Sequence, residues 1–225
     1  MQRFFDVLFS CIALLVLSPL LVPVSLLLRM TGEGEIFFLQ ERIGRGGVPF
    51  KLFKFATMLK NSPNLGTGTM TVKGDPRILP AGKLLRKTKI NELPQLLNIL
   101  FGHMSVIGPR PLTAQTFRAY SPHTQSVVVQ VRPGLSGIGS IIFRGEEDIL
   151  AGAASSVAFY ENVIAPYKGA LEEWYVNNQS IYLYFAAIVV TIWVVLVSRS
   201  NLAWNIFKGL PVPPAELRVA LNFAA

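Results

Sequence analysis

The residues that could do chemistry concentrate in the stretch Leu84–Pro111, which reads LLRKTKINELPQLLNILFGHMSVIGPRP. Its first part holds Arg86 and two lysines, and a single carboxylate, Glu92, follows them. Asp75 is the only other acidic residue within positions 43–143. Nearby cations keep a carboxylate ionised. Glu92 is therefore expected to be either a salt-bridge anchor or a catalytic group.

Two turns each carry one further cation. In the turn Gly108–Pro111, prolines on both sides of Arg110 restrict the backbone. A guanidinium must be correctly oriented to meet a phosphate or carboxylate bidentately, so a restrained arginine suits such recognition. Arg132 heads the tight loop 132–137, whose backbone amides could cradle an anion. The alternative for this loop is an ordinary Pro-Gly turn.

The composition favours a protein of the membrane surface. Of the 225 residues, 51% are hydrophobic and only 15% are charged, which is too apolar for an ordinary soluble domain. The net charge is +8, and 16 of the 21 Lys and Arg residues fall within positions 42–168. Such a basic, apolar chain suits anionic lipid or anionic substrates. It contains no nucleic-acid-binding motif, so we expect no nucleic acid partner. One cysteine and two histidines predict neither a disulfide nor a zinc site.

The N-terminal segment is expected to enter the membrane. Residues 7–28 carry no charge and are long enough for a membrane helix. Arg3 and Arg29 flank the two ends. In a single span one of these positive ends would lie on the disfavoured side of the membrane. We therefore hypothesise a re-entrant helix broken near Ser18 and Pro19, and the alternative is a kinked span. A second uncharged run, 181–197, either spans the membrane or lies along its surface.

The remaining elements predict an α+β, mainly helical fold with one small β-hairpin, built from segments 36–42 and 48–58. Asn91 is expected to cap a helix that continues to Leu100, with Glu92 in its first turn. The domains expected are a membrane helix (1–30), a compact helical domain (31–180) and an apolar C-terminal helix and tail (181–225). Other elements expected are a polar loop at 61–74, a strand at 138–143, and helices at 81–87, 112–120, 121–131, 155–164 and 168–178.

Several separated motifs together resemble the bacterial sugar transferase family, the monotopic phosphoglycosyl transferases. Their order and spacing over about the first 180 residues make the resemblance specific. The N-terminal motifs are Arg3, Phe5-Asp6, Ser18-Pro19, Phe38, Gln40, Arg42, Gly44, Gly47, Phe50, Lys54-Phe55 and Thr57-Met58. The later ones are Asp75-Pro76-Arg77, Gly82, Leu85-Arg86, Glu92 to Leu96, Met104-Ser105, Gly108 to Pro111, Arg132 to Leu135, Gly137, Pro166 and Lys168.

The resemblance implies transfer of a sugar 1-phosphate from a nucleotide sugar to a polyprenyl phosphate. In that family an Asp of an Asp-Glu pair attacks the β-phosphorus, and Mg²⁺ accompanies the diphosphate. The implied partners are a UDP-sugar, undecaprenyl phosphate and membrane lipid, and a homo-oligomer stays open. The implied location is the bacterial inner membrane, with the catalytic domain on the cytoplasmic face. No stretch indicates which sugar is used.

Here Asn91 occupies the position of the nucleophilic Asp. Ala56, Lys89 and His103 also replace the Arg, Ser and Asp usual in the family. An amide cannot serve as that nucleophile, so three outcomes stay open. Glu92 takes over as nucleophile or metal ligand; the polyprenyl phosphate attacks directly while Glu92 holds the metal; or the chain is an impaired paralogue that binds substrate or a partner.

The predicted site therefore has three parts. Glu92 and Asn91 form its catalytic part, and Glu92 is also the expected metal ligand. The cations that match the family pattern are expected to bind substrate phosphates: Lys54, Arg77, Arg86, Arg110 and Arg132. Ser18 and Pro19 are expected to break the membrane helix.

Overall fold

The computed structural model describes residues 1–65, 75–151, 156–197 and 200–223. By its internal contacts the chain divides into two compact units. Unit 1 comprises residues 1–4, 42–50 and 103–225, and unit 2 comprises residues 5–41 and 51–102. The domain boundaries predicted at residues 30 and 180 stay predictions. Most of the predicted loop 61–74 lies outside the described residues.

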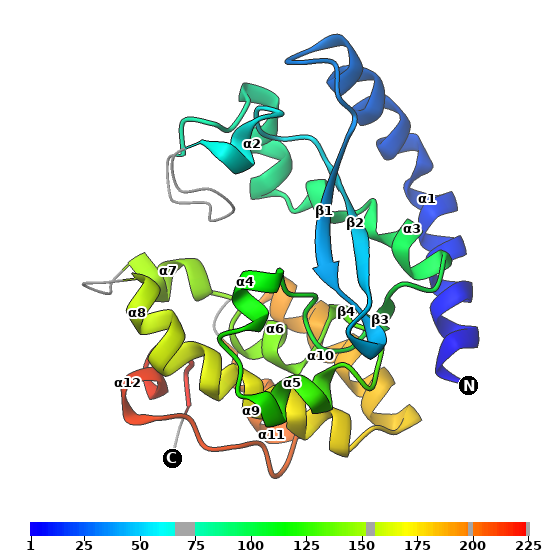
Figure 1. Cartoon of the computed structure of the whole chain (residues 1–225). Coiled ribbons are helices and arrows are strands. Elements are labelled where there is room, and N and C mark those ends of the chain that lie inside the picture. The colour runs from blue at the N-terminus through cyan, green and yellow to red at the C-terminus, as the bar shows by residue number, and fades with distance from the viewer. Residues whose placement is uncertain (66–74, 152–155, 198–199, 224–225) are drawn as a thin grey trace. The chain divides into compact units, whose positions relative to one another are not determined.

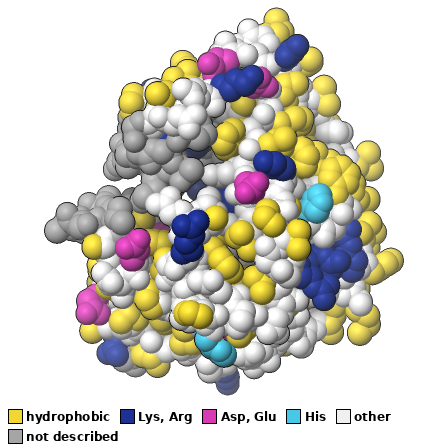
Figure 2. All heavy atoms as spheres, in the orientation of Figure 1, with side chains coloured by type: hydrophobic (Ala, Val, Ile, Leu, Met, Phe, Trp, Pro, Cys, Tyr) yellow, Lys and Arg dark blue, Asp and Glu magenta, His cyan; other side chains and the backbone are white. Residues whose placement is uncertain are grey.

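The uncharged N-terminal segment forms one long helix, α1 (Gln2–Met30), which runs through both of its prolines (Figure 1). Among the described helices, only α1 is long and apolar enough to cross a membrane. Many of its large hydrophobic side chains are exposed, and Figure 2 shows hydrophobic side chains on the surface over α1. A contiguous apolar surface of this kind marks a contact with membrane or protein.

Ser18 compensates for the donor that Pro19 lacks. Proline has no N–H, so the carbonyl of Leu15, four residues earlier, loses its helical hydrogen bond. The Ser18 hydroxyl donates to that carbonyl at 2.7 Å. The helical assignment continues through Ser18 and Pro19, and the break of the membrane helix expected at these residues stays a prediction.

The predicted hairpin is confirmed. Strands β1 (Phe37–Ile43) and β2 (Pro49–Phe55) pair, with the 3₁₀ turn η1 (Arg45–Gly47) between them (Figure 1). Phe55 at the end of β2 is buried in a cluster with Val24 and Leu28 of α1 and with Leu85. The second half of α1 is thus packed against the body of unit 2.

The rest of unit 2 is short helices: η2 (Ser62–Asn64), α2 (Pro80–Lys87), η3 (Ile90–Glu92) and α3 (Gln95–Leu100). The buried Asn98 of α3 fixes this helix to β2. Its Oδ1 accepts from the Phe53 N–H at 2.9 Å, and its Nδ2 donates to the Lys51 carbonyl at 2.7 Å. The segment containing Asn91 and Glu92 therefore connects two anchored helices.

Unit 1 is mainly helical around one small parallel sheet. Strand β3 (Ser105–Ile107) pairs with β4 (Gly134–Ser136), and the register places Ser105 opposite Gly134 and Ile107 opposite Ser136. The helices are α4 (Ala114–Phe117), α5 (Pro122–Val128), α6 (Ile138–Ile142), α7 (Glu146–Ala151), α8 (Ser156–Phe159), the π-helical turn η4 (Tyr160–Ile164), α9 (Ala165–Asn177), α10 (Ile181–Leu196), α11 (Leu202–Ile206) and α12 (Ala215–Arg218).

Three predictions for this unit fail. Residues 138–143, predicted as a strand, form helix α6 and its C-cap. Residues 134–136, predicted as part of a tight loop, form strand β4. In the helix predicted at 112–120, only 114–117 are helical.

Helix α10 has one packed face and one exposed face. It packs against α6 and the β3–β4 sheet, and the hydroxyls of Thr191 and Ser136 lie 2.8 Å apart. Several of its large hydrophobic side chains remain exposed, among them Tyr182, Val189 and Leu196. An exposed apolar face of this kind agrees with contact with a membrane.

Candidate active site

The β3–β4 pairing brings together two of the predicted cationic segments. The turn carrying Arg110 directly follows β3, and Arg132 lies just before β4. The Gly134 N–H donates to the Pro109 carbonyl at 2.7 Å. The Gly108 N–H donates to the Ser136 carbonyl at 2.9 Å. The Arg110 turn and the 132–137 segment are therefore neighbours held by backbone hydrogen bonds.

This close approach explains two glycines. A Cβ atom added at Gly108 would lie 2.5 Å from the Arg132 carbonyl oxygen. One added at Gly134 would lie 2.1 Å from the Gly108 nitrogen. No side chain fits at either position without moving backbone, so glycine is required for the two segments to meet.

Helix α9 supports the same turn from its buried side. The Tyr175 hydroxyl donates to the Ile107 carbonyl at 3.1 Å. One turn earlier, the Glu172 Oε1 accepts from the Arg110 N–H at 3.2 Å. The Arg110 side chain itself is exposed, whereas Gly108 and Pro109 are buried. The backbone of the turn is thus fixed by buried groups of α9, while the Arg110 side chain stays accessible.

Sequence reasoning missed Glu172 and Tyr175. Both are almost fully buried, at 1% and 2% exposure. A helical spacing of three and four residues places them on the same face as Lys168 and the apolar Leu171. A carboxylate at a position that helical periodicity assigns to the core was the available signal.

A shallow pocket lies beside Arg110. The buried Tyr120 lines it. The rest of its walls are mostly aliphatic side chains and prolines: Ile43, Pro109, Leu112, Val128, Val131 and Pro133. The Tyr120 hydroxyl is buried without a hydrogen-bond partner. Burial raises the pKa of Tyr120 well above its ordinary value, so its hydroxyl stays protonated as a donor.

The turn with the carboxylate lies in unit 2 and differs from the expectation. Residues 90–92 form the 3₁₀ turn η3, and α3 begins only after Pro94. Asn91 caps neither element with its side chain, so its predicted role as N-cap is wrong. It is buried instead, and its Oδ1 has no hydrogen-bond partner. Glu92 beside it is half-buried.

Lys89 opens this turn in an unusual conformation. Its backbone φ is +59°, in the left-handed region. A non-glycine residue pays about 1 kcal/mol or more for this conformation. Such strain often lies at functional sites. Lys89 is also one of the positions at which the sequence resemblance leads us to expect a different residue, Ser.

Two more of the predicted phosphate-binding cations belong to unit 2. Arg86 is half-buried in the last turn of α2, the helix that packs against η3. Lys54 is half-buried on β2. Their roles toward substrate stay predictions. Nearby on β2, Lys51 is exposed and pairs with Glu41 at 3.5 Å.

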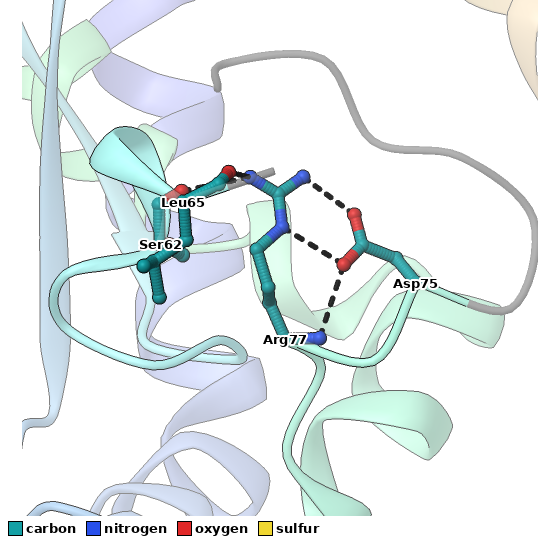
Figure 3. A network of polar contacts seen from close by, with 4 residues as sticks. All are labelled: Ser62, Leu65, Asp75 and Arg77. Carbon is teal, nitrogen blue, oxygen red and sulfur yellow. Dashed lines mark hydrogen bonds and ion pairs between the residues drawn. The ribbon is translucent and has the colours of Figure 1, made fainter. Parts of the chain in front are cut away.

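Arg77 does not have the environment predicted for a substrate ligand. Its side chain is buried at 6% exposure and makes a forked ion pair with Asp75, with Nε–Oδ1 and Nη2–Oδ2 distances of 2.8 and 2.5 Å (Figure 3). Its Nη1 also donates to the carbonyls of Ser62 and Leu65 (Figure 3). This geometry supports a structural role, because the guanidinium is already engaged on both of its sides.

The donor chemistry near η3 fits Mg²⁺. This ion prefers oxygen ligands and is commonly held by one or two protein groups together with substrate phosphates and water. Glu92 supplies a carboxylate, and the adjacent Asn91 supplies a buried amide oxygen that has no hydrogen-bond partner. Within the described residues, no cluster of three or more His, Cys, Asp or Glu side chains forms a complete protein metal site.

Comparison with known proteins agrees with this arrangement. Residues 1–198 match the family model described as bacterial sugar transferase. The chain therefore belongs to the bacterial sugar transferase family, a family of enzymes that transfer sugar phosphates.

Two relatives match over most of their own length. The chain is 39% identical to the exopolysaccharide production protein PSS of Rhizobium leguminosarum bv. phaseoli, over 70% of this chain and 82% of that protein. It is 33% identical to the exopolysaccharide production protein ExoY of Rhizobium meliloti, over 89% of this chain and 87% of that protein.

A third relative is longer. The chain is 36% identical to the UDP-glucose:undecaprenyl-phosphate glucose-1-phosphate transferase of Klebsiella pneumoniae, over 66% of this chain. The match covers 32% of that protein. The similarity therefore concerns about a third of the Klebsiella enzyme.

Proposed function

We propose that this chain transfers a sugar 1-phosphate from a UDP-sugar to undecaprenyl phosphate, the first step of exopolysaccharide, O-antigen or capsule assembly. The observation that carries the proposal is the pairing of the Arg110 turn with the 132–137 segment. Two arginines from adjacent, backbone-bonded segments suit a diphosphate, because guanidinium groups match phosphate oxygens in charge and geometry. Family membership and the names of the relatives support the same reaction.

In the proposed reaction the bond between the β-phosphorus and the bridging oxygen of the UDP-sugar breaks, and UMP leaves with that oxygen. The phosphosugar passes to an oxygen of undecaprenyl phosphate, which forms a new diphosphate. Either the Glu92 carboxylate attacks first and carries the phosphosugar covalently, or the acceptor attacks directly. The cationic side chains stabilise the charge that develops on the phosphoryl oxygens.

We also propose that Glu92 holds Mg²⁺, with the Asn91 side-chain oxygen as a second protein donor. The ion would neutralise the charge of the diphosphate oxygens when bound. The buried, unpartnered Asn91 Oδ1 supports this assignment.

The proposed location is the inner membrane, with the catalytic part on the cytoplasmic face and α1 re-entrant. The exposed apolar surface of α1 supports membrane insertion. A variant in which Cys11→Ser removes the single cysteine allows a cysteine to be placed at Gln2, with Ser126→Cys as an exposed marker of unit 1. In sealed vesicles, labelling of both sites from the same side supports the re-entrant helix. Labelling from opposite sides contradicts it and supports a span.

The reaction is tested by UMP release. Purified chain is incubated with a panel of UDP-sugars, Mg²⁺ and undecaprenyl phosphate. We expect release with at least one sugar, loss of release with EDTA, and recovery with added Mg²⁺. Omission of the acceptor separates the two routes: a stoichiometric burst of UMP supports a covalent Glu92 intermediate, and its absence supports direct attack.

A second candidate function is favoured by Asn91, which stands where the family nucleophile is expected. In this alternative the chain is a catalytically impaired paralogue that binds substrate or scaffolds a polysaccharide assembly. Both forms predict no UMP release with any sugar. A scaffold also predicts a stable partner on pull-down and tolerance of Arg110→Ala in the cell.

A further inference from the structure

Unit 1 contains a buried group of ionisable side chains that the proposed reaction does not use. It lies beside the Arg110 turn and is contributed by α9, α7, η4 and Tyr120, which lies two residues before α5. Its members are Tyr120, Glu146, Tyr160, Lys168 and Glu172, and the charge of the exposed Arg110 acts on four of them, Tyr120, Tyr160, Lys168 and Glu172. Buried charges are costly unless they are paired, so such a group requires a reason.

Lys168 and Glu146 form an ion pair. The Lys168 ammonium is 2% exposed and donates to the Glu146 carboxylate at 2.5 Å. It also lies 5.5 Å from the centre of the Phe143 ring. The attraction between two oppositely charged groups in contact offsets much of the free energy that their removal from water costs. The other carboxylate of the group, Glu172, accepts its hydrogen bonds from backbone N–H groups and not from a side chain.

Glu172 faces backbone instead. Its Oε1 accepts from the N–H of Arg110 at 3.2 Å and also from the N–H of Gly139 in the first turn of α6. Its Oε2 is buried without a hydrogen-bond partner. A Cβ added at Gly139 would lie 2.4 Å from Oε1, so glycine at 139 leaves the space that this carboxylate occupies.

We propose that Glu172 is a positioning residue, whose buried carboxylate holds the Arg110 backbone and thereby aims the Arg110 guanidinium at the phosphates of the substrate. Pro109 and Pro111 restrict the turn within the chain. Glu172 fixes the Arg110 N–H, which lies between the two prolines, to helix α9, while the Arg110 side chain is exposed. The proposal deepens the proposed function, because it requires that Arg110 meets a substrate phosphate.

The contact itself can be tested without activity. In hydrogen–deuterium exchange of the full chain, the peptide containing Arg110 should gain faster uptake at one amide in Glu172→Ala. Glu172→Gln keeps an oxygen acceptor and should retain the slow exchange. Gly139→Ala displaces the carboxylate without removing it and should also speed exchange. Unchanged uptake in both Glu172→Ala and Gly139→Ala overturns the proposal.

The functional consequence is tested by a double-mutant cycle on UMP release. Glu172→Ala should lower kcat/KM about 10²-fold, the scale expected when a catalytic group is misplaced by about 1 Å. The same change in an Arg110→Ala background should have little further effect, because Glu172 acts through Arg110. Glu172→Gln should restore most of the rate. Glu173→Ala is the matched control, because the neighbouring carboxylate bonds Thr124 and does not face Arg110.

The outcomes separate the two claims. An equal loss from Glu172→Ala with and without Arg110 means a general structural role and overturns the positioning proposal. If the native chain releases no UMP while the exchange of the Arg110 amide responds as stated, the proposed function fails and the Glu172–Arg110 contact stands. In that case a role for the contact in catalysis is also overturned.

Discussion

The two regions expected to handle the phosphosugar are built in opposite ways. In unit 1 the Arg110 turn is braced by β4 on one side and by two buried side chains of α9 on the other. In unit 2 the Asn91–Glu92 turn is a single 3₁₀ turn without side-chain capping, opened by a strained lysine. In the sequence resemblance the first region matches the family motifs Gly108 to Pro111 and Arg132 to Leu135, and the second differs from the expected pattern at Lys89 and Asn91. The difference is expected to spare the residues proposed to hold phosphates and to alter the group proposed to attack them.

The largest effect is expected at the altered turn. Glu92→Gln removes the only carboxylate of η3 while keeping its shape, and UMP release should fall about 10³-fold or more. Initial rates at saturating UDP-sugar measure this. Asn91→Ala is the companion variant, expected to lose less. An unchanged rate in Glu92→Gln would remove Glu92 from the site.

The braced region should give the next largest effect. Arg110→Ala or Arg132→Ala should lower kcat/KM about 10²- to 10³-fold, since each removes a donor to the charged phosphoryl oxygens. Arg118→Ala removes an exposed cation of the same unit and is expected to leave kcat/KM unchanged. If Arg118→Ala costs as much as Arg110→Ala, the effect is one of net charge and not of a built site.

Arg77 distinguishes a structural from a substrate-binding cation. Because its guanidinium is paired with the buried Asp75, Arg77→Ala should lower the Tm by roughly 5 °C or more, and Asp75→Asn should also destabilise. Thermal unfolding in detergent measures this. At a temperature where Arg77→Ala remains folded, its KM for UDP-sugar should match that of the native chain. A raised KM with unchanged Tm would return Arg77 to the substrate site.

A pH dependence should come from Glu172. Burial raises its pKa to about 7, from an ordinary value near 4.5. Between these values the folded chain keeps a proton that the unfolded chain has released, so stability falls as pH rises from about 4.5 to about 7. Glu172→Gln removes this term, and its stability relative to the native chain should rise by on the order of 3 kcal/mol between pH 4.5 and 8. Denaturant unfolding at both pH values checks this, with Glu173→Gln as the control.

The smallest effect is expected at Lys89. Lys89→Gly relieves the left-handed backbone and should stabilise the fold by about 1 kcal/mol, seen as a Tm higher by a few degrees. If the lysine serves the reaction, UMP release should fall in the same variant. A variant that is both more stable and fully active would show that the strain has no functional purpose.

The sequence predicted the local elements well where one period or one turn signal dominates. The alternation and glycines of residues 36–58 indicated the hairpin, and the uncharged N-terminal run indicated α1. The strand predicted at residues 138–143 was wrong, because a short apolar run with β-branched residues fits a strand and a helix equally well. Tertiary packing decides there, since α6 places Gly139 against Glu172.

The site was predictable in its residue types and not in its construction. The Pro-Arg-Pro turn and the Arg-Pro-Gly loop each signal a cation on a restrained backbone. Their pairing depends on a parallel register between strands 27 residues apart, which no local pattern specifies. The burial of Arg77 and Asn91 was also not predictable, because the neighbouring residues in the sequence do not show what surrounds a side chain in the fold.

We propose that this chain is an active phosphoglycosyl transferase although Asn91 stands where the resemblance places the nucleophilic Asp. The most direct test compares UMP release by the native chain and by Asn91→Asp under identical conditions, with a panel of UDP-sugars, Mg²⁺ and undecaprenyl phosphate. We expect sugar-dependent release by the native chain and its loss in Glu92→Gln. Release by Asn91→Asp alone, with a silent native chain, would contradict the proposal and identify a binding protein.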